Sequence, residues 1–162
     1  MTEVIIKNCA TYDVNLIKSH LEAGIELLGG WERFISPGMQ VLLKVNLIGP
    51  MASDTAAVTH SEFVRALTQI LIERECIVWI GDSSGGAIAG IAPTTQSLIV
   101  SGLVKVAREE GALIKNFDKE GVKEITPSSG RFEKMYLASP MFDADFVINL
   151  PKLKTHSAGI YT

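Results

Sequence analysis

Polar residues stand at the ends of two apolar stretches of this sequence. Lys44 and Asn46 come at the end of one stretch, and Asp82 and Ser83 come one residue after the apolar run 77–80. A lysine within a buried strand needs a carboxylate or a ligand beside it, because an unpaired buried charge costs a great deal of free energy. Two compatible interpretations of Lys44 follow. It forms an internal ion pair with Asp82, or it contacts an anionic ligand.

A third group of polar residues follows the last apolar stretch of the chain. Lys152, Lys154 and Thr155 offer donors that suit an anionic group, and His156 adds a ring that titrates near neutral pH. A solvated basic turn is the alternative interpretation of this segment. His60 comes after the stretch that contains Lys44. Either histidine is therefore a candidate general acid or base.

These residues predict a site with three kinds of role. We expect Lys44, Asn46, Ser83, Lys152, Lys154 and Thr155 to bind a small anion. His156 and His60 would move a proton, and Asp82 would orient a lysine or a histidine. The alternative is a metal-dependent enzyme that uses His60, Asp82 and His156 as ligands, although their spacing matches no known metal motif.

The loop 81–86 could also contribute to binding. Its small residues resemble a turn that cradles an anion before a helix. It matches neither of the glycine-rich patterns of nucleotide-binding loops. A simple connection between a strand and a helix is therefore the favoured interpretation of this loop.

The elements that must position these residues are strands and helices, which alternate along most of the chain. Strands are expected at 3–7, 41–45, 77–80, 112–114 and 145–150, and helices at 13–28, 59–71 and 95–110. Thr59 and Glu62 have the spacing of a capping box at the second helix. This order predicts a three-layer α/β domain with a mostly parallel sheet and helices on both faces. An antiparallel hairpin is expected over 122–137.

The expected sheet explains why distant residues should meet. Parallel strands end at one edge of a sheet, and open α/β sheets bind their ligands outside that edge. Lys44, Asp82 and Lys152 each end or follow a predicted strand. We therefore expect one crevice at the carboxyl ends of the strands.

Composition limits the function classes. The 162 residues suit one domain, 1–162, and a formal net charge of −3 disfavours a nucleic-acid binder. No apolar run reaches the length of about 18 residues that a membrane helix needs. The two cysteines, Cys9 and Cys76, form no disulfide framework, so we expect a reduced, cytoplasmic location. A mean hydropathy of +0.25 and an uncovered last strand predict the N-terminal part of a longer protein, and a possible homo-oligomer.

Five segments of the chain resemble one family. The segments are 43–47, 59–61, 81–85, 101–103 and 149–156. The sequence is similar there to domain of unknown function 362, an uncharacterised family of bacterial and archaeal proteins. The segment Asn149–His156 is the most specific of the five.

The resemblance implies a redox setting without naming a reaction. Many members of the family carry a ferredoxin-like part with two four-iron clusters, and this chain lacks such a part. We therefore expect no cofactor in this chain and a 4Fe-4S cluster only in a longer protein. Function stays open between an enzymatic or redox-linked domain that binds a small anion and a non-catalytic binding or assembly module.

Overall fold

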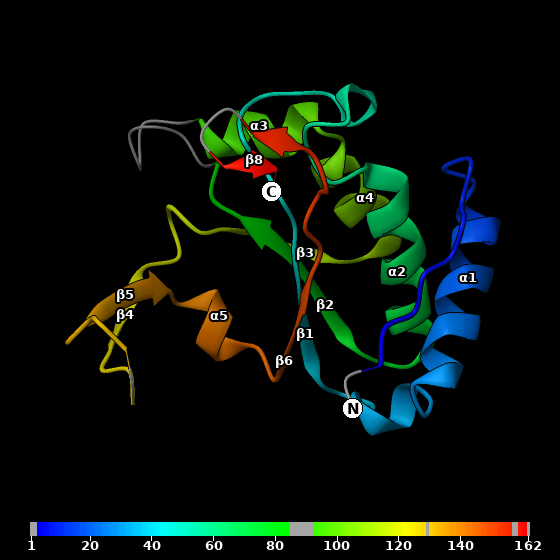
Figure 1. Ribbon diagram of the computed structural model, residues 1–162, viewed down its shortest axis with the longest axis horizontal. Helices are drawn as coiled ribbons and strands as arrows, with labels where there is room; N and C mark the ends of the chain where they lie inside the picture. The colour runs from blue at the N-terminus through cyan, green and yellow to red at the C-terminus, as the bar shows by residue number, and fades with distance from the viewer. Residues whose placement is uncertain (1–2, 85–92, 129, 157–158, 162) are drawn as a thin grey trace.

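The structure of this chain is a computed structural model that describes residues 3–84, 93–128, 130–156 and 159–161. Figure 1 shows the arrangement of its elements. The helices are α1 (Val14–Leu27), α2 (Ser61–Glu73), α3 (Thr94–Val100), α4 (Leu103–Glu110) and α5 (Pro140–Asp143). The strands are β1 (Gln40–Lys44), β2 (Ile77–Asp82), β3 (Leu113–Asn116), β4 (Val122–Ile125), β5 (Met135–Ala138), β6 (Phe146–Asn149), β7 (Thr155–His156) and β8 (Ile160–Tyr161).

A four-stranded parallel sheet forms the centre of the molecule, in the order β3-β2-β1-β6. Strand β1 is paired on both sides, and its Val41, Leu42 and Leu43 are fully buried. Such a continuous apolar run is typical of a parallel strand that is covered on both faces. In the register of the sheet, Lys44 lies beside Gly81 on one side and beside Asn149 on the other.

Alternate residues of the strands supply two cores, one on each face of the sheet. Val41 and Leu43 join the larger core, over which α1, α2 and α4 pack. Leu42 and Trp79 point to the opposite face, where they meet residues around α5. Figure 1 shows α5 and the β4–β5 hairpin on that side. The predicted α/β class, with a mostly parallel sheet, helices on both faces and an added antiparallel hairpin, is confirmed.

Local signals set the ends of the helices. The carboxylate of Asp13 accepts a hydrogen bond from the Leu16 N–H and caps α1. The helix that was predicted over 95–110 is in fact two helices, α3 and α4. Gly102 separates them with a φ of 83°, a left-handed conformation that glycine adopts without strain.

Two further sequence predictions are wrong. Residues 3–7 form no strand, although their apolar run favours one. This N-terminal segment lies along α1 instead, and Val4 and Ile6 are 75% and 89% exposed. Thr59 does not cap α2 either. The N-cap is His60, whose Nδ1 accepts a hydrogen bond from the Glu62 N–H at 3.2 Å.

No membrane-spanning helix is expected from the sequence, and the lengths of the helices bear on this expectation. Across the described part of the chain, no helix is both long enough and apolar enough to span a bilayer.

Candidate functional site

An ion pair joins the carboxyl ends of β1 and β2. The Lys44 Nζ atom lies 3.0 Å from Asp82 Oδ1, and it also donates to the Val45 carbonyl oxygen at 3.0 Å. The side chain of Asp82 is 9% exposed, whereas that of Lys44 is 32% exposed. The predicted internal pair is therefore present. Its lysine is still within reach of solvent.

The carboxylate of Asp82 also holds the backbone that follows β1. Its Oδ2 atom accepts a hydrogen bond from the Leu47 N–H at 2.8 Å. Burial raises the pKa of Asp82 above its ordinary value, and the charge of Lys44 and the N–H groups of Leu47 and Ser83 partly offset this effect. Ser83 is half-buried next to it. Asp82 thus orients both a lysine and a loop.

Thr59 ties together the two segments that leave β1 and β6. Its Oγ1 accepts a hydrogen bond from the Asn46 N–H and donates one to the Leu150 carbonyl oxygen, both at 2.8 Å. The Asn46 side chain donates from Nδ2 to the Ala57 carbonyl oxygen at 3.1 Å. Thr59 is buried, so these bonds are shielded from water. Asn46 therefore shapes the loop before His60.

His60 belongs to a second polar cluster at the same edge. The ring of Tyr12 stacks on the ring of His60, with centroids 3.5 Å apart and planes 5° from parallel. The Lys152 Nζ atom donates to the Tyr12 hydroxyl oxygen at 2.8 Å. Three segments that are far apart in the sequence meet here, and two of them carry predicted site residues.

The environment of His60 favours its neutral form. Burial lowers the pKa of His60 and the charge of Lys152 lowers it further, while the carboxylates of Glu62 and Asp54 oppose both effects. Because Nδ1 accepts the cap hydrogen bond, the proton of the neutral ring resides on Nε2. This tautomer suits His60 to donate a hydrogen bond to a ligand.

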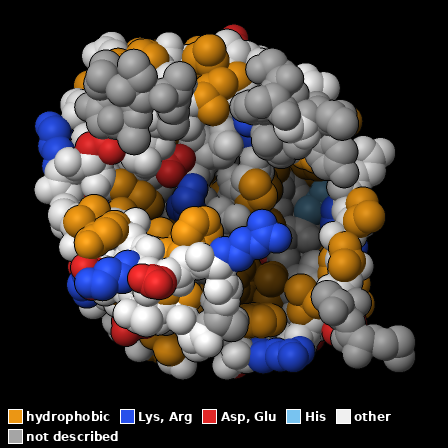
Figure 2. All heavy atoms as spheres, turned by 60° about the vertical axis from the view of Figure 1, so that its left-hand side comes forward, with side chains coloured by type: hydrophobic (Ala, Val, Ile, Leu, Met, Phe, Trp, Pro, Cys, Tyr) orange, Lys and Arg blue, Asp and Glu red, His pale blue; other side chains and the backbone are white. Residues whose placement is uncertain are grey.

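The space-filling view adds the shape of the molecule on one side. Figure 2 shows a hollowed face in which basic, acidic and histidine side chains gather among apolar ones. Such a mixture inside a concavity is typical of ligand sites.

The remaining predicted residues lie on the segment after β6. Lys154 is half-buried, and Thr155 is exposed and pairs with Tyr161 between β7 and β8. The side chain of His156 lies outside the described part of the structure. So do Gly85 and Gly86 of the predicted anion loop.

Metal ligation was the alternative for this site. Within the described ranges, no three His, Cys, Asp or Glu side chains lie together in a way that could hold a metal ion. The set with His60, Asp82 and His156 stays a prediction, since it needs the histidine side chain that is not described.

An iron–sulfur cluster does not fit the residues of this chain. A four-iron cluster takes four cysteine thiolates, and the sequence holds Cys9 and Cys76. Cys9 is exposed and Cys76 is buried.

Two residues of the site escaped the sequence analysis. Thr59 was interpreted as a helix cap, and its spacing to Glu62 gave no sign of a bond to Leu150. Tyr12 lies between the expected strand 3–7 and α1, but a lone tyrosine at that place was not considered as a site residue.

Comparison with known proteins agrees with the segments singled out above. Residues 41–162 match the family described as domain of unknown function (DUF362). Over 148 residues the chain is 32% identical to the "Thylakoid-associated protein sll1697" of Synechocystis sp. (strain ATCC 27184 / PCC 6803 / Kazusa). That match covers 91% of this chain and 43% of the relative, so the chain spans less than half of the relative's length. No solved structure matches. The chain therefore belongs to the DUF362 family.

Proposed function

We propose that this domain binds a small anion, a carboxylate or a phosphate, at the carboxyl edge of its sheet. The observation that carries the proposal is Lys44. Its ammonium group is fixed by the buried Asp82, yet 32% of the side chain stays exposed. A cation that is both oriented and accessible can form a charge-assisted hydrogen bond to an anion with little further loss of freedom.

The position of Lys44 in the sheet supports this proposal. The chain leaves β1 toward β2, and β6 pairs with β1 on its other side. The strand order therefore changes direction between β1 and β6. Open α/β sheets bind ligands where the strand order changes direction, outside the carboxyl ends of the strands. Lys152 follows β6 at this edge, and the neutral His60 adds a hydrogen-bond donor. In a redox-linked protein, electron carriers would come from outside this chain.

Titration calorimetry with inorganic phosphate and with malonate tests the proposal. Removing Lys44 alone would leave Asp82 charged and buried, so the variant for binding is the double change Lys44→Met with Asp82→Asn. We expect it to weaken binding by about 1.5–3 kcal/mol, the usual contribution of a hydrogen bond to a charged group. Lys152→Met should also weaken binding.

The matched control is Lys123→Ala. Lys123 lies on β4, outside the parallel sheet, where it pairs with Asp143. Binding of neither anion at millimolar concentration would overturn the proposal, as would an equal loss in the control variant. Binding of a protein partner alone, with no anion, would favour the assembly module.

A further inference from the structure

An apolar groove runs along α1. A cavity of about 440 Å³ lies between α1 and the N-terminal segment, and a second one of about 330 Å³ lies between α1 and β6. Leu21, Ile25, Leu28 and Phe63 line both cavities, so the two adjoin. Pockets for small molecules commonly have volumes of about 300–1,000 Å³.

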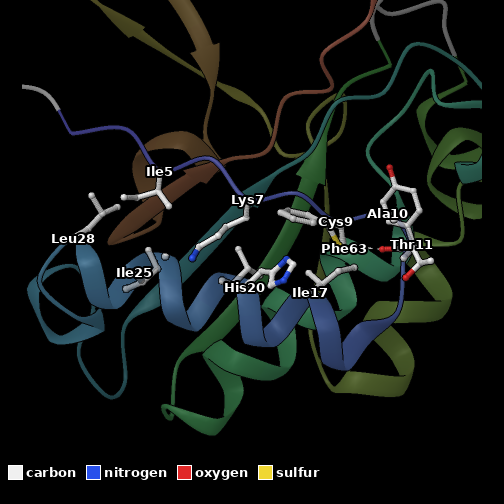
Figure 3. A pocket seen from close by; sticks show the side chains of 13 residues that line it. Ile5, Lys7, Cys9, Ala10, Thr11, Ile17, His20, Ile25, Leu28 and Phe63 are labelled. Atoms are coloured by element: carbon white, nitrogen blue, oxygen red, sulfur yellow. Dashed lines mark hydrogen bonds between the residues drawn. The ribbon is translucent and has the colours of Figure 1, made fainter.

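The two ends of this groove differ in chemistry. Lys7 and His20 line the first cavity, and Figure 3 shows them pointing into it from the N-terminal segment and from α1. Among the described residues that line the second cavity, all but Asn149 are apolar, and Trp31 is one of them. The groove therefore has a basic end and a long apolar end.

The polar groups at the basic end lack partners in the part of the chain that the structure describes. Lys7 has no ion pair or hydrogen bond with any residue in the described ranges. The Nδ1 atom of His20 is buried, and it has no hydrogen-bond partner among these residues either. A buried polar atom without a partner costs free energy, so an acceptor at this end would be favourable.

From this geometry we infer that the groove binds a free long-chain carboxylic acid, of the fatty-acid class. The carboxylate lies at Lys7 and His20, and the acyl chain follows α1 toward Trp31 and β6. The charge of Lys7 selects an anionic head group. The elongated apolar walls select a single hydrocarbon chain, whose burial drives binding.

Tryptophan fluorescence tests this placement, because the two tryptophans lie on opposite faces of the sheet. Trp31 lines the groove, whereas Trp79 belongs to the core around Leu42. The probe is dodecanoate that carries bromine on its terminal carbon, used below its micelle concentration, since bromine quenches nearby indoles. We expect saturable quenching in the Trp79→Phe variant, where Trp31 remains, and none in Trp31→Phe.

Substitutions in the groove separate binding from chance contact. A Cβ at Gly24 would lie 3.6 Å from Ile5 Cγ2, an ordinary contact, so Gly24→Leu places its branches in the groove and also suits a helix. We expect this variant to lose quenching and to keep its circular dichroism spectrum. Lys7→Met should weaken binding about two- to fivefold, the range for an exposed charge pair.

Lys105→Met on α4 is the matched control and should bind like the unchanged protein. Absence of quenching, or equal quenching of Trp31 and Trp79, overturns the inference. If Gly24→Leu abolishes quenching but Lys7→Met does not weaken it, the carboxylate assignment is wrong. The phosphate and malonate titrations vary Lys44, Asp82 and Lys152, and none of these residues lines either cavity. Failure of those titrations would therefore leave this result standing, and the reverse also holds.

Discussion

The carboxylate of Asp82 depends on Lys44 for its stability in the folded protein. Asp82 is buried, so its carboxylate needs the ammonium group 3.0 Å away. We predict that Lys44→Met lowers the free energy of unfolding by about 2–3 kcal/mol. This is less than the roughly 3–5 kcal/mol expected when one partner of a fully buried pair is removed, because Lys44 is partly solvated. Urea unfolding at pH 7 measures the loss.

The double variant Lys44→Met with Asp82→Asn is the control for this prediction. It removes the charge that the single variant leaves unpaired, so most of the lost stability should return. An unchanged free energy of unfolding in Lys44→Met would contradict the prediction. It would show that Asp82 does not rely on Lys44.

The pKa of His60 predicts a dependence of stability on pH. Burial and Lys152 lower this pKa in the folded protein, so the unfolded chain binds more protons near pH 6.5. Stability must therefore rise with pH there, and it is lost as the pH falls from 6.5 through the folded pKa. His60→Asn keeps an acceptor at the N-cap of α2 and removes the titration. The unchanged protein should lose more stability than this variant between pH 7.5 and 5.

Thermal unfolding of both proteins over this pH range makes the measurement. Lys152→Met removes one cause of the lowered pKa, so its stability should depend less on pH. Parallel curves for the unchanged protein and His60→Asn would contradict a lowered pKa for His60.

The ion pair of the site could be predicted from the sequence, but the ring stack of Tyr12 and the hydrogen bonds of Thr59 could not. A lysine within an apolar run demands a partner, and Asp82 at the end of the next strand was the available one. The stack of Tyr12 on His60 depends on the path of the segment before α1. The two hydrogen bonds of Thr59 depend on how two loops cross. Neither path leaves a periodic signal in the sequence.

Among the elements, β2 and β3 leave no room for a side chain at Gly81. A Cβ atom there would lie 2.5 Å from the Lys115 carbonyl oxygen and 2.8 Å from Phe117 Cε1. The backbone cannot move aside without disturbing the pairing of the two strands. We predict that Gly81→Ala lowers the free energy of unfolding by about 1–3 kcal/mol, as is typical of overpacked cores.

Gly24→Ala is the matched control for Gly81→Ala. Its Cβ would lie at an ordinary contact distance of 3.6 Å from Ile5, and alanine favours the helical conformation more than glycine does. This variant should unfold at an equal or higher urea concentration than the unchanged protein. Equal stability of Gly81→Ala and the unchanged protein would mean that the strands lie further apart.

Strands and helices could be predicted where the residue pattern suits only one kind of element. The buried run 41–45 has no helical alternative, because Gly38 and Gly49 limit its length. Residues 3–7 show as strong a run of β-branched residues. The residue pattern alone does not provide a neighbouring strand, and without one this segment stays extended along α1. The break at Gly102 was missed because one glycine is tolerated within many helices.

On the scale of the whole molecule, the centre of the sheet is better protected than its edge at β6. Strand β1 is paired on both sides and fully buried at its centre, whereas β6 pairs only with β1 among the described strands. The outer edge of β6 therefore presents backbone groups that can pair with another chain. Phe146 and Ile148 lie along it and are half-buried.

Amide hydrogen exchange tests how that edge is used. The amides of Leu42 and Leu43 should exchange slowest, by global unfolding. We predict that the amides of β6 exchange faster at low protein concentration and gain protection as the concentration rises, because a second copy covers the open edge. Sedimentation velocity over the same concentrations should show association. Protection of β6 that equals that of β1 at every concentration, in a protein that sediments as a monomer, would contradict the prediction, since the edge would then be covered within one chain.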